Sequence, residues 1–134
     1  LERGMQFDHA QGACLQDYRL AFNKRSVKYP GTASANVMPE SGQVVEGVLY
    51  RLRHELEILK MDPFEGYPVR YNRQLLALDP EVGASLNGWV YIANADHVEE
   101  GLLPPRWYLN HLLAGSEYLS DSYCERLKQT PCTD

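Results

Sequence analysis

Alternating hydrophobic and polar residues dominate the first third of the chain. From Cys14 to Asn23 apolar and polar side chains alternate, a pattern that predicts a strand with one buried face. Residues 32–38 alternate small side chains and residues 43–52 are rich in β-branched and aromatic ones, so each segment is predicted to form a further strand. The Pro-Glu-Ser-Gly sequence at 39–42 predicts a turn between these two strands.

The spacing changes after the third predicted strand. In residues 53–61 leucines recur at helical intervals, which predicts a helix. The Asp-Pro pair at 62–63 is expected to end it, because the residue before a proline is driven out of the α region. Residues 62–71 contain two prolines and a glycine and predict a sharp corner. Further strands are expected at 69–78 and 88–95, and the second is apolar enough for burial on both faces.

Two helices are predicted to complete the chain. One covers residues 106–114, since proline is favourable at a helix start and glycine at its end. The other runs from about Ser122 to Gln129, with Glu125 as the partner in a capping box. Strands and helices do not alternate regularly, so we expect an α+β fold with a curled mixed sheet in a single domain of 134 residues.

Composition and charge exclude several classes of protein. The chain is 44% apolar and 23% charged, and its net charge of −5 argues against a nucleic-acid partner, which needs a concentrated Lys/Arg face. The short basic run at 23–28 is interpreted as a solvated end of a strand. No segment approaches the ~20 apolar residues that cross a bilayer, and no signal peptide is recognisable, so no membrane partner is expected.

The cysteines and histidines predict no metal centre. Cys14, Cys124 and Cys132 are odd in number and lack C-x-x-C spacing, which argues against a disulfide framework or a zinc site and favours a reducing cytoplasm. The histidines lie in separate segments, and the sequence contains no phosphate-binding, dinucleotide-binding or hydrolase motif. We therefore expect neither a metal nor a cofactor.

Glu65 is the main candidate for chemistry. It lies between Phe64 and the Gly66-Tyr67 turn, where bulky apolar neighbours could desolvate its carboxyl group and adapt it to proton transfer. The alternative is a solvated glutamate in an ordinary turn. If the chain is an enzyme, its reaction is one that a carboxyl group can run as a proton shuttle without a protein nucleophile.

The motifs around this corner resemble those of a known family. The sequence Glu65-Gly66-Tyr67-Pro68-x-x-Tyr71, preceded by Val45-Glu46-Gly47-Val48-Leu49-Tyr50, is similar to the gamma-glutamylcyclotransferase-like (AIG2-like) family. Further family elements agree in order and extend over nearly the whole chain: Leu15-x-x-Tyr18-Arg19-Leu20-Ala21-Phe22, Ala35-Asn36, Pro105-x-x-Tyr108, Leu112-Leu113-Ala114-Gly115 and Tyr123-x-x-x-Leu127.

The resemblance implies a fold, an activity and a site. The fold is a small mixed β-barrel-like sheet of about five to seven strands, with flanking helices and a pocket at the mouth of the barrel. The activity is gamma-glutamyl cyclotransfer, which releases 5-oxoproline and a free amine or amino acid from a small gamma-glutamyl substrate. Glu65 matches the catalytic general acid/base, and Tyr71, Tyr108 and Gly66 match substrate-binding positions.

Other readings of these residues stay open at this stage. Tyr71 and Tyr108 could equally be core residues whose hydroxyls bond the backbone. Arg70 and Arg73 flank the corner and could meet a substrate carboxylate, although alternation along the strand favours a solvated position for Arg70. The whole chain could also be a non-catalytic small-molecule-binding or stress-response relative, or a structural protein in which Glu65 is exposed with no cavity beside it.

One departure from the family concerns the start of the chain. Family members begin with a strand and a Tyr-Gly-Ser-Asn loop whose backbone N–H groups hold the substrate, and this sequence contains no Tyr-Gly-Ser. We therefore expect about 15 to 20 further residues before Leu1 in the natural protein. The motifs are compatible with several leaving groups, including amino acids, glutathione-type peptides and ε-lysine, and with any oligomeric state.

Overall fold

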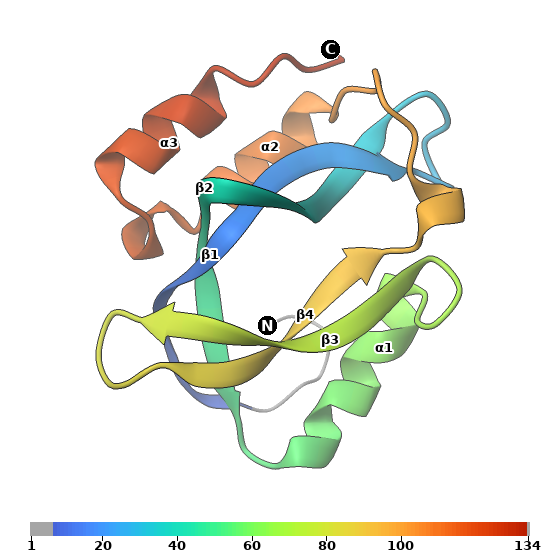
Figure 1. The fold of residues 1–134 in the computed structure, drawn as a ribbon. Helices are drawn as coiled ribbons and strands as arrows, with labels where there is room; N and C mark the ends of the chain where they lie inside the picture. The colour runs from blue at the N-terminus through green and yellow to red at the C-terminus, as the bar shows by residue number, and fades with distance from the viewer. Residues whose placement is uncertain (1–6, 134) are drawn as a thin grey trace.

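The computed structural model describes residues 7–133, apart from the side chain of Glu55. This part of the chain forms four β-strands, three α-helices and three short 3₁₀ helices. Their bounds are β1 Phe7–Arg25, β2 Ala33–Leu52, η1 Glu55–Glu57, α1 Ile58–Glu65, β3 Tyr71–Pro80, β4 Leu86–Ala93, η2 Ala95–His97, α2 Arg106–Leu113, η3 Ser116–Tyr118 and α3 Asp121–Lys128. Figure 1 shows two β-hairpins, with α2 and α3 beside the β1–β2 hairpin and α1 beside the β3–β4 hairpin.

β1 and β2 form one long antiparallel hairpin. The sequence predicted two strands separated by a turn at 39–42 where the structure has the single strand β2, so that prediction is wrong. The extra residues form a bulge opposite Asp17, which adopts a left-handed φ of 63° and accepts the N–H of Gly42 through its carboxylate at 2.9 Å. The Pro-Glu-Ser-Gly sequence therefore bends the strand instead of reversing the chain.

The sheet has the order β2-β1-β3-β4. All its strand pairs within the described residues are antiparallel, which corrects the predicted mixed sheet of about five to seven strands. Within the described residues, β1 pairs with β3 through Ala13 and Cys14, and beyond this point the two hairpins diverge (Figure 1). A side chain links them again further along, because Oδ1 of Asn36 accepts the N–H of Ala93 at 2.8 Å. The sheet thus curls like a barrel without closing.

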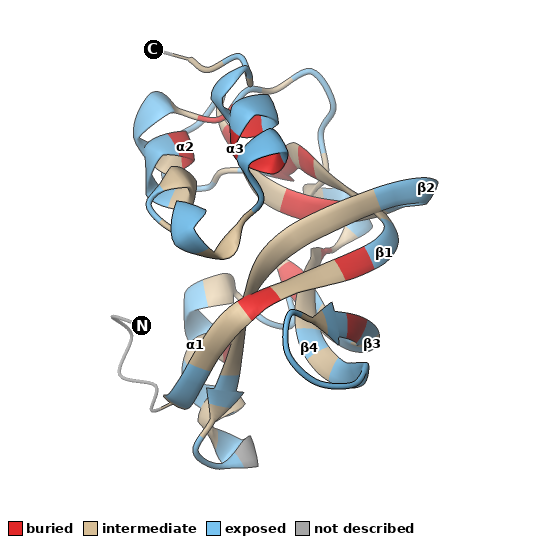
Figure 2. Ribbon diagram, turned by 90° about the vertical axis from the view of Figure 1, so that its left-hand side faces the viewer, coloured by how far each residue is buried: buried red, intermediate tan, exposed pale blue. Residues whose placement is uncertain are grey.

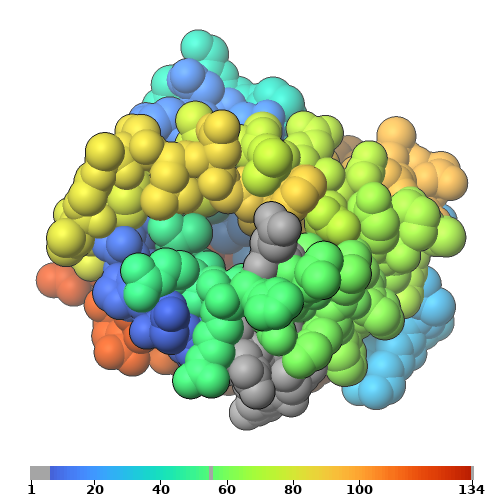
Figure 3. All heavy atoms as spheres, turned by 90° about the horizontal axis from the view of Figure 1, so that it is seen from below, coloured from blue at the N-terminus to red at the C-terminus, as the bar shows by residue number. Residues whose placement is uncertain are grey.

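Two clusters of buried hydrophobic side chains hold the elements together. One is built around Leu15 and Leu78, from the two hairpins. The other is built around Leu109 and Tyr123 and joins α2 and α3 to β1, as the buried positions on these elements show in Figure 2. Seen from below in Figure 3, the β3–β4 hairpin (yellow) and the segment from the end of β2 into α1 (green) form opposite sides of one face.

Helix α1 continues past the point where the sequence predicted its end. It includes Asp62 and Pro63 and stops at Gly66, which has a left-handed φ of 72°. The N–H of Gly66 bonds the carbonyl of Pro63, and the N–H of Tyr67 bonds that of Asp62, the pairing that closes a helix with a left-handed glycine. Pro63 removes only its own N–H from the helix, so glycine and not proline sets the end of the helix.

The C-terminal helices differ little from the prediction. α2 begins after Pro105, as expected. α3 is capped by Ser120 rather than Ser122, because the hydroxyl of Ser120 accepts the N–H of Tyr123. The carboxylate expected from Glu125 comes instead from Glu46 of β2, whose two oxygens bond the N–H and the hydroxyl of Ser120 at 2.7 Å each. No helix within residues 7–133 has the length and apolar character of a membrane-crossing segment.

Candidate functional site

The corner after α1 is anchored by a buried acid. Asp62 accepts two hydrogen bonds from the guanidinium of Arg73, at 2.9 and 3.1 Å, and a third from the hydroxyl of Tyr91 at 2.6 Å. The same guanidinium lies 4.3 Å from the ring centroid of Trp89 and 4.7 Å from that of Tyr67. The hydrogen bonds to Asp62 therefore give Arg73 a structural role, and its guanidinium is already occupied. These contacts fix the last turn of α1 on the β3–β4 hairpin.

Glu65, the last residue of α1, lines a cavity of about 290 Å³. The wall comes from the end of β1 and the loop after it, from the first residues of β2, from the corner and from the start of α2. Tyr71 and Tyr108 line the same cavity, so segments far apart in the sequence bring three of the four predicted site residues together. Gly66 lies outside the lining and packs beneath the guanidinium of Arg70.

The hydroxyls of Tyr71 and Tyr108 both bond the backbone of Ala35 in β2. The hydroxyl of Tyr71 donates to the carbonyl of Ala35 at 2.7 Å, and the hydroxyl of Tyr108 accepts the N–H of Ala35 at 3.0 Å. Burial raises the pKa of Tyr71 well above its usual range, while its contact with the hydroxyl of Ser34 opposes the rise. Both hydroxyls bond the backbone of Ala35, and both residues line the cavity.

Lys24 is a site residue that the sequence did not indicate. The basic run at 23–28 was interpreted as solvated, yet Lys24 is only 5% exposed and lines the cavity. A bulge between Ala21 and Lys24 breaks the alternation and turns both Asn23 and Lys24 inward. A bulge of this kind has no local sequence signal here, which is why pattern analysis placed the lysine in solvent.

The ammonium group of Lys24 has an unusual environment. It lies 5.5 Å from the ring centroid of Tyr71, and it forms no ion pair with any carboxylate among the side chains that the structure describes. Burial and, secondly, the charge of Arg70 lower its pKa, whereas the carboxylate of Glu65 acts in the opposite direction. A buried cation without a paired anion costs stability.

The charges around the cavity are unequal. Among the described residues, Lys24, Lys28 and Arg70 contribute three cationic side chains to the lining and Glu65 contributes one acidic side chain. Arg70 was predicted to be solvated, but its contact with Gly66 places it on the wall. The cavity thus combines a positive potential, which attracts carboxylates, with a single acid that can exchange a proton.

Fold and site together define a small α+β domain with a ligand cavity lined by an acid, tyrosines and cations. The chain belongs to the family described as gamma-glutamyl cyclotransferase, AIG2-like, which matches residues 2–109. The resemblance seen in the sequence is therefore confirmed, and the family implies cyclotransferase-type activity on a small gamma-glutamyl substrate. No curated protein matches the chain significantly by sequence.

Solved structures share the fold at low sequence identity. An uncharacterised protein from Homo sapiens, loc79017, is 21% identical with a TM-score of 0.82, over 99% of this chain and 79% of that one. A structure described as gamma-glutamyl cyclotransferase is 21% identical with a TM-score of 0.81, over 98% and 78% of the two chains. YkqA from Bacillus subtilis is 22% identical with a TM-score of 0.79, over 95% and 47%.

We expect Gly66→Ala to destabilise the fold by about 2 kcal/mol, as measured by urea unfolding. A left-handed φ costs an alanine about 1 kcal/mol or more, and a Cβ at this position would collide with the guanidinium of Arg70. Gly101→Ala is the matched control, because Gly101 has a φ of 86° but open space around it. Equal losses in the two variants would show that the contact between Gly66 and Arg70 contributes nothing.

Proposed function

We propose that this protein is a gamma-glutamyl cyclotransferase in which Glu65 is the general acid/base. The observation that supports the proposal best is the cavity that joins Glu65 to two tyrosine rings and to a buried Lys24, which forms no ion pair within residues 7–133. An exposed Glu65 without a cavity, as in a purely structural protein, is not what the structure contains. Membership of the family supplies the reaction class.

The reaction uses the substrate's own α-amine as nucleophile. The amine nitrogen attacks the γ-carbonyl carbon, a new C–N bond closes the five-membered ring, and the original γ-amide C–N bond breaks. Glu65 accepts a proton from the attacking amine and returns it to the leaving nitrogen, so that 5-oxoproline and a neutral amine are released without a co-reactant. Ring closure is intramolecular, which removes the need for an activated serine or cysteine.

The charges in the cavity suit the head group of such a substrate. A gamma-glutamyl group carries an α-carboxylate beside its α-amine, so it needs a cation and a base within a few ångströms of each other. We assign the α-carboxylate to the ammonium of Lys24 and the amine to Glu65, whose charges already act on each other across the cavity. The rings of Tyr71 and Tyr108 then form the wall against the aliphatic chain of the substrate.

A cytoplasmic location is part of the same proposal. Cys14, Cys124 and Cys132 are all free, which suits the reducing cytoplasm expected from the sequence. Gamma-glutamyl amino acids and glutathione-type peptides are the corresponding candidate substrates.

The direct test is an assay of the full-length protein against a panel of gamma-glutamyl amino acids, peptides and amines, with 5-oxoproline measured by chromatography. We expect release from at least one member of the panel. The same compound with an acetylated α-amine should release nothing, because its nucleophile is blocked. No 5-oxoproline from any compound would reject the enzymatic proposal.

A non-catalytic binding protein is the second candidate. It is favoured by the tyrosine hydroxyls, which are bonded to Ala35 and therefore less available to stabilise a developing oxyanion. This candidate predicts that 5-oxoproline or a gamma-glutamyl compound binds, as seen by calorimetry, without turnover.

A further inference from the structure

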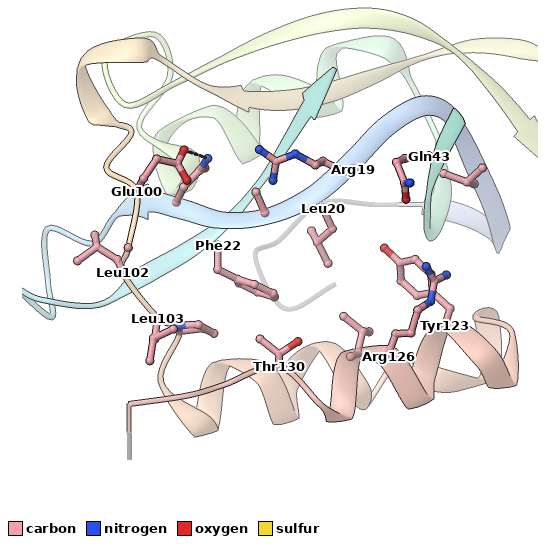
Figure 4. Close-up of a pocket in the computed structure, with 16 residues that line it drawn as sticks. Arg19, Leu20, Phe22, Gln43, Glu100, Leu102, Leu103, Tyr123, Arg126 and Thr130 are labelled. Carbon is pink, nitrogen blue, oxygen red and sulfur yellow. Dashed lines mark hydrogen bonds between the residues drawn. The ribbon is translucent and has the colours of Figure 1, made fainter. Parts of the chain in front are cut away.

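A second cavity, of about 400 Å³, lies between the β1–β2 hairpin and α3. Leu20 and Phe22 of β1 contribute apolar side chains to it, and Leu127 of α3 lies on the helical side. Leu103, in the loop before α2, forms one end. Figure 4 shows these elements enclosing the space from different sides. None of its lining residues lines the cavity of Glu65, so the two cavities are separate.

A buried hydroxyl faces this second cavity. Tyr123 is 6% exposed, and its hydroxyl proton has no acceptor among the described residues. Figure 4 shows the hydroxyl pointing from α3 toward β1, into the space near Leu20. Burial raises the pKa of Tyr123, and the backbone N–H of Glu46 opposes the rise. An N–H can only donate, so the proton of the phenol still lacks an acceptor.

A buried hydroxyl proton without an acceptor is costly, by about 1–3 kcal/mol. Native proteins bond nearly all such groups to protein, water or ligand. The described residues supply no acceptor for this proton, which leaves the role to water or to a ligand in the cavity.

The neighbouring charge indicates which acceptor this is. The guanidinium of Arg126 lies 5.2 Å from the ring centroid of Tyr123, and it forms no ion pair with a carboxylate among the described residues. Arg19 also lines the cavity but is bound to Glu40 at 3.2 Å. An anionic acceptor could accept the hydrogen bond of the phenol and form an ion pair with the guanidinium at the same time. A neutral acceptor would form no ion pair with Arg126.

We propose that this cavity binds a small organic acid, with one carboxylate held by Tyr123 and Arg126 and an aliphatic or aromatic body packed against Leu20, Phe22 and Leu127. The size of the cavity falls in the range of small-molecule sites. Its lining combines these apolar side chains with charged ones, among them Arg126 and Glu100. The proposal does not depend on the activity of the Glu65 cavity.

The test uses 4-phenylbutyrate as the probe and 4-phenylbutanol as its neutral counterpart. Each is titrated into the full-length, isotopically labelled protein, and binding is followed through the amide resonances of β1 and α3. The carboxylate is expected to bind at least tenfold more tightly than the alcohol. Equal affinities, the absence of shifts, or shifts confined to the residues around Glu65 would each overturn the proposal.

Two variants locate the carboxylate. Tyr123→Phe removes only the hydroxyl, whose proton has no acceptor among the described residues, and should leave folding intact. Arg126→Gln removes an exposed charge, and we expect each variant to weaken 4-phenylbutyrate binding about fivefold to tenfold. Lys128→Gln is the control, because Lys128 lies on the same helix, is paired with Glu125 and does not line the cavity. Unchanged binding in both test variants, or an equal loss in the control, would contradict the assignment.

Discussion

Glu65→Gln is expected to lower the kcat for 5-oxoproline release about 1000-fold while leaving the fold intact. Glutamine has the size of glutamate but cannot take the proton of the attacking amine, and a positioned general acid/base contributes on the order of 100- to 10,000-fold. KM should change little, because in this mechanism the carboxyl group acts mainly in the proton transfer from the attacking amine to the leaving nitrogen. The measurement is steady-state kinetics on the best substrate of the panel, with urea unfolding in parallel.

The control is Glu125→Gln, which removes an equal charge from the exposed face of α3. It should leave both kinetics and stability within experimental error. Activity retained by Glu65→Gln would remove the carboxyl group from the mechanism. A loss of activity that accompanies a loss of folding would point to a structural role for Glu65 instead.

Lys24→Met is expected to have opposite effects on activity and stability. Loss of the charged hydrogen bond to the α-carboxylate should lower kcat/KM about 30-fold, mainly through KM. The free energy of unfolding should rise by about 1 kcal/mol, because methionine fills a similar volume without a buried, unpaired charge. The contact with the ring of Tyr71 offsets only part of the cost of burying that charge.

A substrate that lacks the α-carboxylate separates this role from a structural one. The corresponding 4-aminobutanamide still closes a ring, to 2-pyrrolidinone, and wild-type protein should use it poorly. Lys24→Met should not lower that rate further, since the interaction it removes is already absent. Equal losses on both substrates would reject the assignment of Lys24. Lys28→Met, at an exposed position of the same cavity, should cost only a few-fold.

The pH dependence of stability gives an independent check. The pKa of Lys24 is lowered from its ordinary 10.5 by burial and by Arg70, so the unfolded chain binds more protons than the folded one between the two pKa values. Stability of the wild-type protein should therefore rise with pH in that window. Lys24→Met lacks this rise, so its stability advantage should be full below the folded-state pKa of Lys24 and shrink toward pH 10.5.

Much of the fold was readable because its signals are local. Helix α2 lies between Pro105 and Gly115 as predicted, and the strands after residue 69 differ from the prediction by about two residues. The candidate site was accessible for a similar reason: Glu65, Gly66 and Tyr71 lie within one short motif at a corner. Such motifs combine turn chemistry and function in a few positions, so the family could be identified from them.

The residues that the sequence missed depend on contacts between distant segments. Lys24 faces inward because of a bulge in β1. Ser120 caps α3 and is itself bonded to Glu46, and Arg73 donates hydrogen bonds to Asp62. No periodicity within a single strand or helix encodes these choices, since each is decided by what packs opposite. Pattern analysis therefore assigned the lysine and the capping serine incorrectly.

By itself, the sequence determined the family, the α+β class, the corner at residues 62–71 and Glu65 as its candidate acid. The tertiary structure decided that β2 is one bent strand, that the hydroxyls of Tyr71 and Tyr108 are bonded to backbone, and that Lys24 faces Glu65 across a cavity. The physical reason is the distance along the chain over which each kind of interaction acts. Turn and helix signals act over a few residues, whereas burial and charge pairing are settled only when distant segments meet.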